Sequence, residues 1–159
     1  MMENLSSIPL DYGEQGWWSD LISEVYIYDL YEQYDRAIDG DADALFDLAL
    51  FCLKEDIDVN ETDAIALLEK AAKEGHDDAI CKIGLLYAYG DGTPKNYKKA
   101  ITWFTQAASK GHPDAQNELG NLYEAGKGVL KDFKSALEWY IKSAEQNHAG
   151  AQYNLGLMY

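Results

Sequence analysis

The sequence has little cysteine and no long apolar run, and both absences exclude classes of protein. Cys52 and Cys81 are the only 2 cysteines among 159 residues, and their spacing is not CxxC. They favour a reducing compartment and indicate neither a disulfide framework nor a zinc site. No apolar run approaches the roughly 18 to 20 residues of a membrane-spanning helix. Residues 1–5 lack the basic and apolar parts of a secretory signal, so we expect a cytoplasmic protein.

Basic residues are scarce in the first half of the chain. Residues 1–76 hold 19 Asp and Glu but 4 Lys and Arg, a net charge of −15, which is also the net charge of the whole chain. Residues 77–159 hold 9 of each kind and are neutral. We expect no nucleic-acid binding, which needs cations that displace counterions, and no binding to anionic membranes. The acidity favours a basic protein partner, and solubility alone explains it equally well.

Catalytic motifs are missing too. Gly90-x-Gly92 lacks the third glycine and the preceding strand of a dinucleotide fingerprint, and no Walker sequence occurs. There is no Gly-x-Ser-x-Gly motif, and Cys81 has no evident histidine base. The carboxylates stand among polar residues, as expected of a solvated face. We therefore expect no enzyme activity, no catalytic residues and no cofactor.

A period of 36 residues runs through the chain. It is marked by His76, His112 and His148. These histidines are one repeat apart, about 10 Å for stacked helix pairs, which is too far to share one metal ion. We therefore predict no metal site and a structural histidine in each turn between repeats. Other columns share the period: Ala64, Ala100 and Ala136; Gly84, Gly120 and Gly156; Trp103 and Trp139.

Each repeat is expected to form two antiparallel helices. Ala79, Ile83 and Tyr87 stand at i, i+4 and i+8, on one face of a helix over about 77–89. The glycine column within this helix weakens it by about 1 kcal/mol per residue relative to alanine, which indicates close approach of a neighbouring helix. Caps are expected in further columns: Asn60, Asn96 and Asp132 as N-caps, and Gly75, Gly111 and Asn147 at the C-terminal ends of second helices.

These motifs resemble the Sel-one-like repeat, a relative of the tetratricopeptide repeat. The resemblance rests on Leu-Gly-x-x-Tyr, Gly-x-Gly, Ala-x-x-Trp-Tyr/Phe and Gly-His-x-x-Ala, and it covers residues 41–159. It implies an all-α fold, a right-handed α-α superhelix (solenoid) of antiparallel helix pairs, and a non-catalytic adaptor role. The expected units are 41–76, a degenerate repeat in which Ala49 replaces the glycine; 77–112; 113–148; and 149–159, the first helix of a truncated repeat.

Residues 1–40 are expected to form an acidic, aromatic-rich lead-in and an N-terminal capping helix. Terminal repeats of solenoids are atypical because their outer face meets water. Residues 1–35 carry eight acids and no Lys or Arg, together with several tyrosines and tryptophans. Aromatic residues are enriched at binding hot spots. We therefore name Asp29, Tyr31 and Glu32 as partner-binding candidates.

A second candidate surface follows from the resemblance, which implies that the first helices line a concave groove. We expect some of its residues to pack against the neighbouring first helix and the rest to face a partner. The predicted groove residues are Asp43, Phe46, Leu50, Asp78, Cys81, Leu85, Tyr89, Asn117, Asn121, Glu124 and Tyr153.

Two functions are consistent with these features. The first is a non-catalytic protein–protein interaction module that binds a basic partner through the acidic N-terminal half and the groove, as an immunity or antitoxin-type stoichiometric inhibitor does. The alternative is a general scaffold that assembles signalling or secretion complexes through the concave face. Residues 149–159 would leave the apolar side of a first helix uncovered, so a homodimer through this edge is a further expectation.

Overall fold

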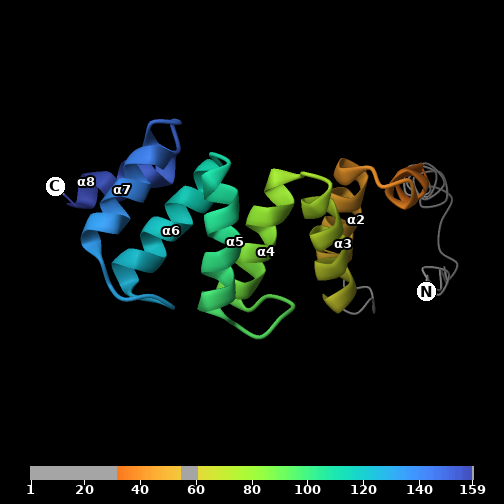
Figure 1. Cartoon of the computed structure of the whole chain (residues 1–159), viewed down its shortest axis with the longest axis horizontal. Coiled ribbons are helices and arrows are strands. Elements are labelled where there is room, and N and C mark those ends of the chain that lie inside the picture. Colours follow the sequence, from red (N-terminus) through yellow and green to blue (C-terminus); the bar gives the residue numbers. More distant parts are fainter. Residues whose placement is uncertain (1–31, 55–60, 159) are drawn as a thin grey trace, which may run out of the picture.

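Pairs of antiparallel helices follow one another along the longest axis of the molecule (Figure 1). The computed structural model describes residues 32–54 and 61–158. Residues 32–38 are helical, and seven helices follow: α2 (Ala42–Lys54), α3 (Glu61–Lys73), α4 (Asp77–Tyr89), α5 (Tyr97–Ser109), α6 (Pro113–Ala125), α7 (Phe133–Ala144) and α8 (Ala149–Met158). The described residues form helices and turns without a strand. The expected all-α solenoid is confirmed.

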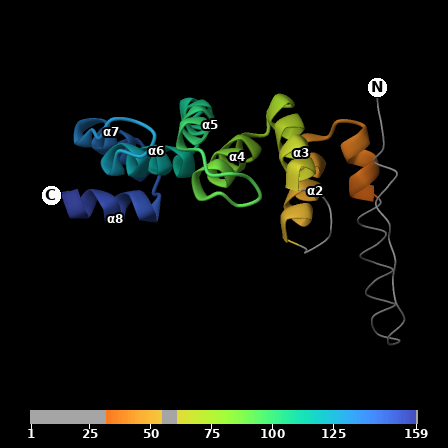
Figure 2. The ribbon, with the colours of Figure 1, turned by 90° about the horizontal axis from the view of Figure 1, so that it is seen from below.

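The helices contact mainly their neighbours in the sequence. Within a repeat, α2 packs on α3, α4 on α5 and α6 on α7, while α3–α4, α5–α6 and α7–α8 join successive repeats. Figure 2 shows the same succession from below, with the orange helical segment at 32–38 beyond α2 and α3 on one side and α7 and α8 at the opposite end. Distant repeats therefore influence one another only through those between them.

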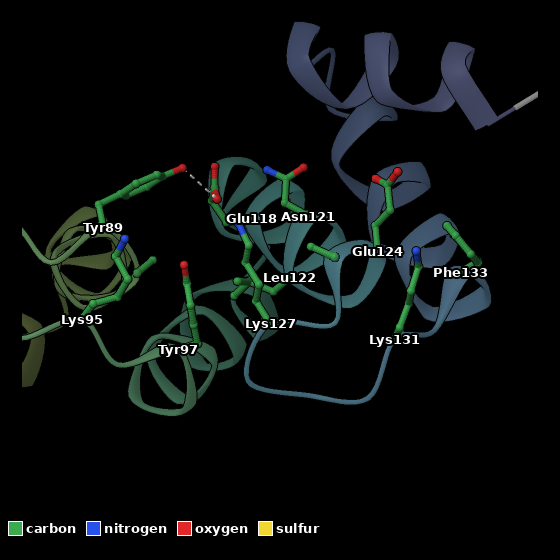
Figure 3. A pocket seen from close by; sticks show the side chains of 12 residues that line it. Tyr89, Lys95, Tyr97, Glu118, Asn121, Leu122, Glu124, Lys127, Lys131 and Phe133 are labelled. Carbon is green, nitrogen blue, oxygen red and sulfur yellow. Dashed lines mark hydrogen bonds between the residues drawn. The ribbon is translucent and has the colours of Figure 1, made fainter.

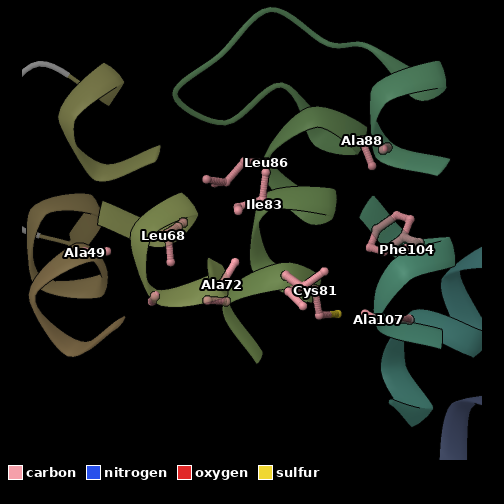
Figure 4. Close-up of a cluster of buried hydrophobic side chains, with 14 of the residues drawn as sticks. Ala49, Leu68, Ala72, Cys81, Ile83, Leu86, Ala88, Phe104 and Ala107 are labelled. Atoms are coloured by element: carbon pink, nitrogen blue, oxygen red, sulfur yellow. The ribbon is translucent and has the colours of Figure 1, made fainter. Parts of the chain in front are cut away.

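One cluster of buried apolar residues extends from Ala37 to Leu122, and Ala136, Tyr140 and Ala151 are buried beyond it. Leu68, Ile83 and Phe104 are fully buried in this cluster, and alanines fill the tighter contacts (Figure 4). The aromatic residues of α5 and α7 divide in two: Phe104 and Tyr140 are fully buried, whereas Trp103 and Trp139 are partly buried at the edge of the core.

The glycine column permits the expected close approach, and the contact is with a buried ring. A Cβ atom on Gly84 would lie 2.6 Å from two ring atoms of Phe104, and one on Gly120 would overlap the ring of Tyr140. A Cβ on Gly156 would meet nothing within 4 Å. The first two glycines thus make room for the aromatic side chain of the second helix in the same repeat.

The predicted caps are present wherever the structure describes them. Asn96 accepts a hydrogen bond from the amide of Lys99, and Asp132 accepts one from Lys134. Gly75, Gly111 and Asn147 adopt positive φ angles of 98°, 95° and 63° at the ends of second helices, the left-handed conformation that ends a helix. Asn60, the first loop at 56–59 and most of the predicted capping helix lie outside the described residues.

Candidate interaction surface

The three histidines join successive repeats in the same way. Each Nδ1 accepts a hydrogen bond from a backbone amide three residues on, at 3.2 Å for His76, 3.4 Å for His112 and 3.0 Å for His148. Because Nδ1 accepts, the proton of the neutral ring is on Nε2. That nitrogen faces an aspartate of the preceding first helix, Asp43, Asp78 or Asp114, at 3.5, 2.8 and 2.8 Å respectively. The histidines therefore have the structural role predicted for them in the turns between repeats, and they have it as N-caps of the first helices, which we did not predict from the sequence.

This arrangement gives three predicted groove residues a role inside the molecule. The side chains of Asp43 and Asp78 lie on His76 and His112 but remain 81% and 67% exposed. Phe46, also a predicted groove residue, stacks on the ring of His76 with centroids 4.2 Å apart. These three side chains therefore help to hold the first repeat boundaries, and both carboxylates remain accessible to a partner.

Two other groove residues are buried. Cys81 is 3% exposed and Asn117 is 8% exposed, so neither presents a surface to a partner in this conformation. Burial raises the pKa of the Cys81 thiol to about 12, and nearby carboxylates add to the shift. Asn117 Oδ1 accepts a hydrogen bond from Asn154 Nδ2 of α8 at 3.1 Å. Asn117 therefore contacts the neighbouring first helix, as we expected of some members of this set.

The remaining predicted residues are spread from one end of the described chain to the other. Glu32 is exposed at the start of the described region, and Asp29 and Tyr31 lie outside it. Leu50 and Leu85 are partly buried, whereas Tyr89 and Tyr153 are 62% and 68% exposed. Only Tyr89, Asn121 and Glu124 among these candidates line the same cavity. Whether the others bind a partner stays a prediction.

That cavity has a volume of about 630 Å³ and lies where α4 and α6 meet the loops that follow them (Figure 3). Its lining residues are Ala88, Tyr89, Lys95, Tyr97, Glu118, Asn121, Leu122, Glu124, Ala125, Lys127, Lys131 and Phe133. The loops are held by backbone hydrogen bonds, from Asn96 N to Tyr87 O at 2.7 Å and from Asp132 N to Tyr123 O at 3.0 Å. Backbone hydrogen bonds therefore fix the walls of the cavity.

The two glutamates of the cavity are held by tyrosines. Tyr89 OH donates to Glu118 Oε2 at 3.4 Å. Tyr140 OH lies 2.8 Å from both Glu124 Oε2 and Asn121 Oδ1 and shares its proton between them. Burial raises the pKa of Glu118, and hydrogen bonds with Asn121 and Tyr89 oppose that shift. Desolvation also raises the pKa of Tyr140, and the hydrogen bond to Glu124 adds to the effect.

The three lysines of the cavity lie near aromatic rings. Lys95 Nζ and Lys127 Nζ are 5.9 and 5.7 Å from the centroid of the Tyr97 ring, and Lys131 Nζ is 4.5 Å from that of Phe133. The ion pairs of the described residues, all within 4.0 Å, involve Arg36, Lys110 and the histidines but none of these lysines. This basic group is not among the residues predicted from the sequence.

Metal sites and membrane spans are both missing from the part of the chain that the structure describes. No group of three or more His, Cys, Asp or Glu side chains is placed to hold a metal ion in residues 32–54 and 61–158. Over the same ranges, no helix has both the length and the apolar character needed to cross a membrane.

Comparisons with known proteins give one family. The model of the Sel1 repeat matches residues 42–76, 77–112, 113–148 and 149–159. No curated protein sequence matches the chain.

Solved structures agree with the family match. A Sel1 repeat protein from Oxalobacter formigenes is 38% identical, with a TM-score of 0.72 over 80% of this chain and 97% of its own. The protein c5321, a protective antigen of uropathogenic Escherichia coli with an SLR fold, is 32% identical, with a TM-score of 0.76 over 80% of this chain. This chain spans 27% of the length of c5321. Helicobacter pylori cysteine rich protein B shares the fold at 21% identity and a TM-score of 0.63, over 79% of this chain and 96% of its own.

Proposed function

We propose, because the chain belongs to the Sel1 repeat family, whose members generally mediate protein–protein interaction, that it is a non-catalytic module that binds a basic protein. The acidic N-terminal half would supply the contact, continued by the concave groove. A stoichiometric inhibitor of the immunity-protein type is the sharpest form of this proposal. The two cysteines, with Cys81 buried, favour a reducing compartment such as the cytoplasm.

The charge of the first described helices is the observation that carries the proposal. Residues 32–54 contain six acidic residues against Arg36 and Lys54. Five of the six acids are exposed, and Arg36 is already paired with Asp41 at 2.6 Å. An exposed surface of one sign attracts an oppositely charged partner and accelerates association.

Two matched triple variants test the proposal in a pull-down from the source cell, followed by binding measurements on the captured partner. The first neutralises exposed acids of the N-terminal half, Asp35→Asn, Asp39→Asn and Asp47→Asn. The second neutralises exposed acids of the later repeats, Asp91→Asn, Glu138→Gln and Glu145→Gln. All six side chains belong to exposed residues, so both variants lose the same charge.

We expect the N-terminal variant to bind about tenfold more weakly, at ~0.5 kcal/mol per exposed charge, and the control to bind like the wild type. The affinity of the wild type should fall as salt is added. An affinity that is independent of ionic strength, or equal losses in the two variants, would refute the proposal.

The scaffold alternative places the main contact in the groove and predicts a different order of affinity losses among the variants. Substitutions at Asn121 and Tyr153 would then weaken binding more than charge neutralisation in the N-terminal half. The exposure of Tyr153 and the position of Asn121 in the cavity wall favour this alternative. Both arms can be measured on the same captured partner.

A further inference from the structure

The cavity beside α4 and α6 has an unbalanced set of charges. It is lined by three lysines and two glutamates. Each glutamate already accepts a hydrogen bond from a tyrosine hydroxyl, from Tyr89 to Glu118 and from Tyr140 to Glu124. The lysine ammonium groups lie on aromatic faces without a carboxylate within ion-pair distance among the described residues. The unused binding capacity of the cavity is therefore cationic.

Two of the lysines are brought together by the packing of a loop. Gly128, with a φ of 76°, lies against Tyr97, and a Cβ at this position would be 2.7 Å from Tyr97 Cβ. The loop after α6 therefore lies on the start of α5, and Lys127 reaches the same ring as Lys95. Figure 3 shows Tyr89, Lys95 and Tyr97 on one side of the cavity and Lys131 with Phe133 on the other.

The volume of the cavity and its other lining residues suit a ligand larger than a simple ion. A volume of about 630 Å³ is within the roughly 300 to 1,000 Å³ of pockets that take drug-sized ligands. The rings of Tyr89 and Phe133 are 62% and 54% exposed, so they can cover apolar side chains. The Asn121 amide can pair with a peptide backbone. Tyr89, Asn121 and Glu124 also belong to the predicted groove, so an extended segment lying in the groove would reach the lysines.

We propose that this cavity binds an acidic peptide segment of a partner, with a side-chain or C-terminal carboxylate on Lys95, Lys127 and Lys131 and an apolar side chain against Phe133 or Tyr89. The ammonium groups that have no carboxylate partner would donate to it, and carboxylates form short, charge-assisted hydrogen bonds with such groups. The site belongs to the two neutral repeats, 77–148, and its ligand has the opposite charge to the partner of the N-terminal half. It therefore goes beyond the function proposed above and does not depend on it.

The test measures binding of a fluorescein-labelled peptide of alternating glutamate and leucine with a free C-terminus, by fluorescence anisotropy on the full chain. The cavity variant is Lys95→Gln, Lys127→Gln and Lys131→Gln. The matched control is Lys98→Gln, Lys134→Gln and Lys142→Gln, three exposed lysines of the same repeats that do not line the cavity. Both variants lose three positive charges. Circular dichroism and urea unfolding establish that each is folded as the wild type is.

We expect saturable binding that the cavity variant weakens at least tenfold and the control less than twofold. A peptide with glutamine in place of glutamate should bind far more weakly. The proposal is overturned by the absence of saturable binding, by equal losses in the two variants, or by equal binding of the glutamine peptide. Displacement of the peptide by submillimolar inorganic phosphate would also overturn it, because the site would then be a general anion site.

Discussion

The glycine column of the first helices allows one sequence position to be tested in different surroundings. Gly→Ala within a helix gains about 1 kcal/mol when the new methyl group has space. Gly156 has that space, whereas a methyl group at Gly84 would lie 2.6 Å from the ring of Phe104, which is 0% exposed. Carbon atoms pack at about 3.5 to 4.0 Å, so the ring or the helix must move by about 1 Å.

Overpacking of this kind costs about 1 to 3 kcal/mol. Gly84→Ala should therefore lower the free energy of unfolding by up to about 2 kcal/mol after the helix-propensity gain of about 1 kcal/mol is subtracted. Gly156→Ala should raise it by up to about 1 kcal/mol. Urea unfolding followed by circular dichroism and tryptophan fluorescence measures both. The two free energies should differ by up to about 3 kcal/mol, which corresponds to a difference in Tm of up to roughly 6 to 12 °C for a chain of this length.

A rescue variant separates the steric cause from other effects. Phe104→Leu removes the ring that a methyl group at Gly84 would meet, at its own cost in buried area. In that background, Gly84→Ala should lower the free energy of unfolding less than it does in the wild type, or raise it. The difference measures the coupling between the two contacting residues. The steric explanation would be wrong if Gly84→Ala stabilised the wild type as Gly156→Ala does. It would also be wrong if the cost of Gly84→Ala were the same with and without Phe104→Leu.

Two further predictions concern the histidine caps and the partly buried Glu118. His112→Ala should lower the free energy of unfolding by about 1 kcal/mol, the usual loss of an N-cap. His112→Asn should lower it less, because asparagine keeps the acceptor of the cap and loses only the contact with Asp78. Urea unfolding measures both variants, and equal losses would contradict the capping role. Burial raises the folded pKa of Glu118 above its usual 4.5, so the contribution of this group to stability is full below about pH 4.5 and falls as the pH rises through the folded pKa. The stability of Glu118→Gln relative to the wild type should therefore rise as the pH is raised from about 4 to 7. Urea unfolding at each pH measures this difference. A change in the opposite direction would contradict the burial of the Glu118 carboxyl group.

The sequence predicts the repeated framework well because each framework residue acts within one repeat or on the next. The histidine and the N-cap of the second helix satisfy backbone groups a few residues away. The glycine in the first helix pairs with an aromatic residue 20 positions later, as Gly84 does with Phe104 and Gly120 with Tyr140. Local chemistry that recurs at a fixed period can be recognised without knowing the three-dimensional path.

The cavity could not be predicted in the same way, because its walls come from two repeats and two loops. How deeply a groove residue is buried depends on how closely the first helix of the next repeat packs against it. Cys81 is buried and Tyr89 is exposed, although both stand in the predicted groove set. Lys127 reaches Tyr97 because Gly128 lets the loop after α6 lie on the start of α5, in the preceding repeat. The spacing of residues along the sequence predicts none of these contacts.

One signal in the sequence nevertheless points to the cavity, and it lies in the differences between repeats. Glu118, Asn121 and Lys127 line the cavity, and 36 residues earlier the same positions hold Lys82, Leu85 and Asp91. The chemistry of these columns therefore changes from one repeat to the next.

The framework positions, in contrast, keep their residue types in repeats 77–112 and 113–148, where the histidine caps and the contacts between glycine and an aromatic ring are the same. A residue with such an internal role cannot change without a cost in stability, whereas a cavity residue can change with the ligand. The variable columns of a repeat protein are therefore where its binding chemistry should be sought. Here they supply Glu118, Asn121 and Lys127, whereas Lys95 and Lys131 stand 36 residues apart in one column that keeps its residue type.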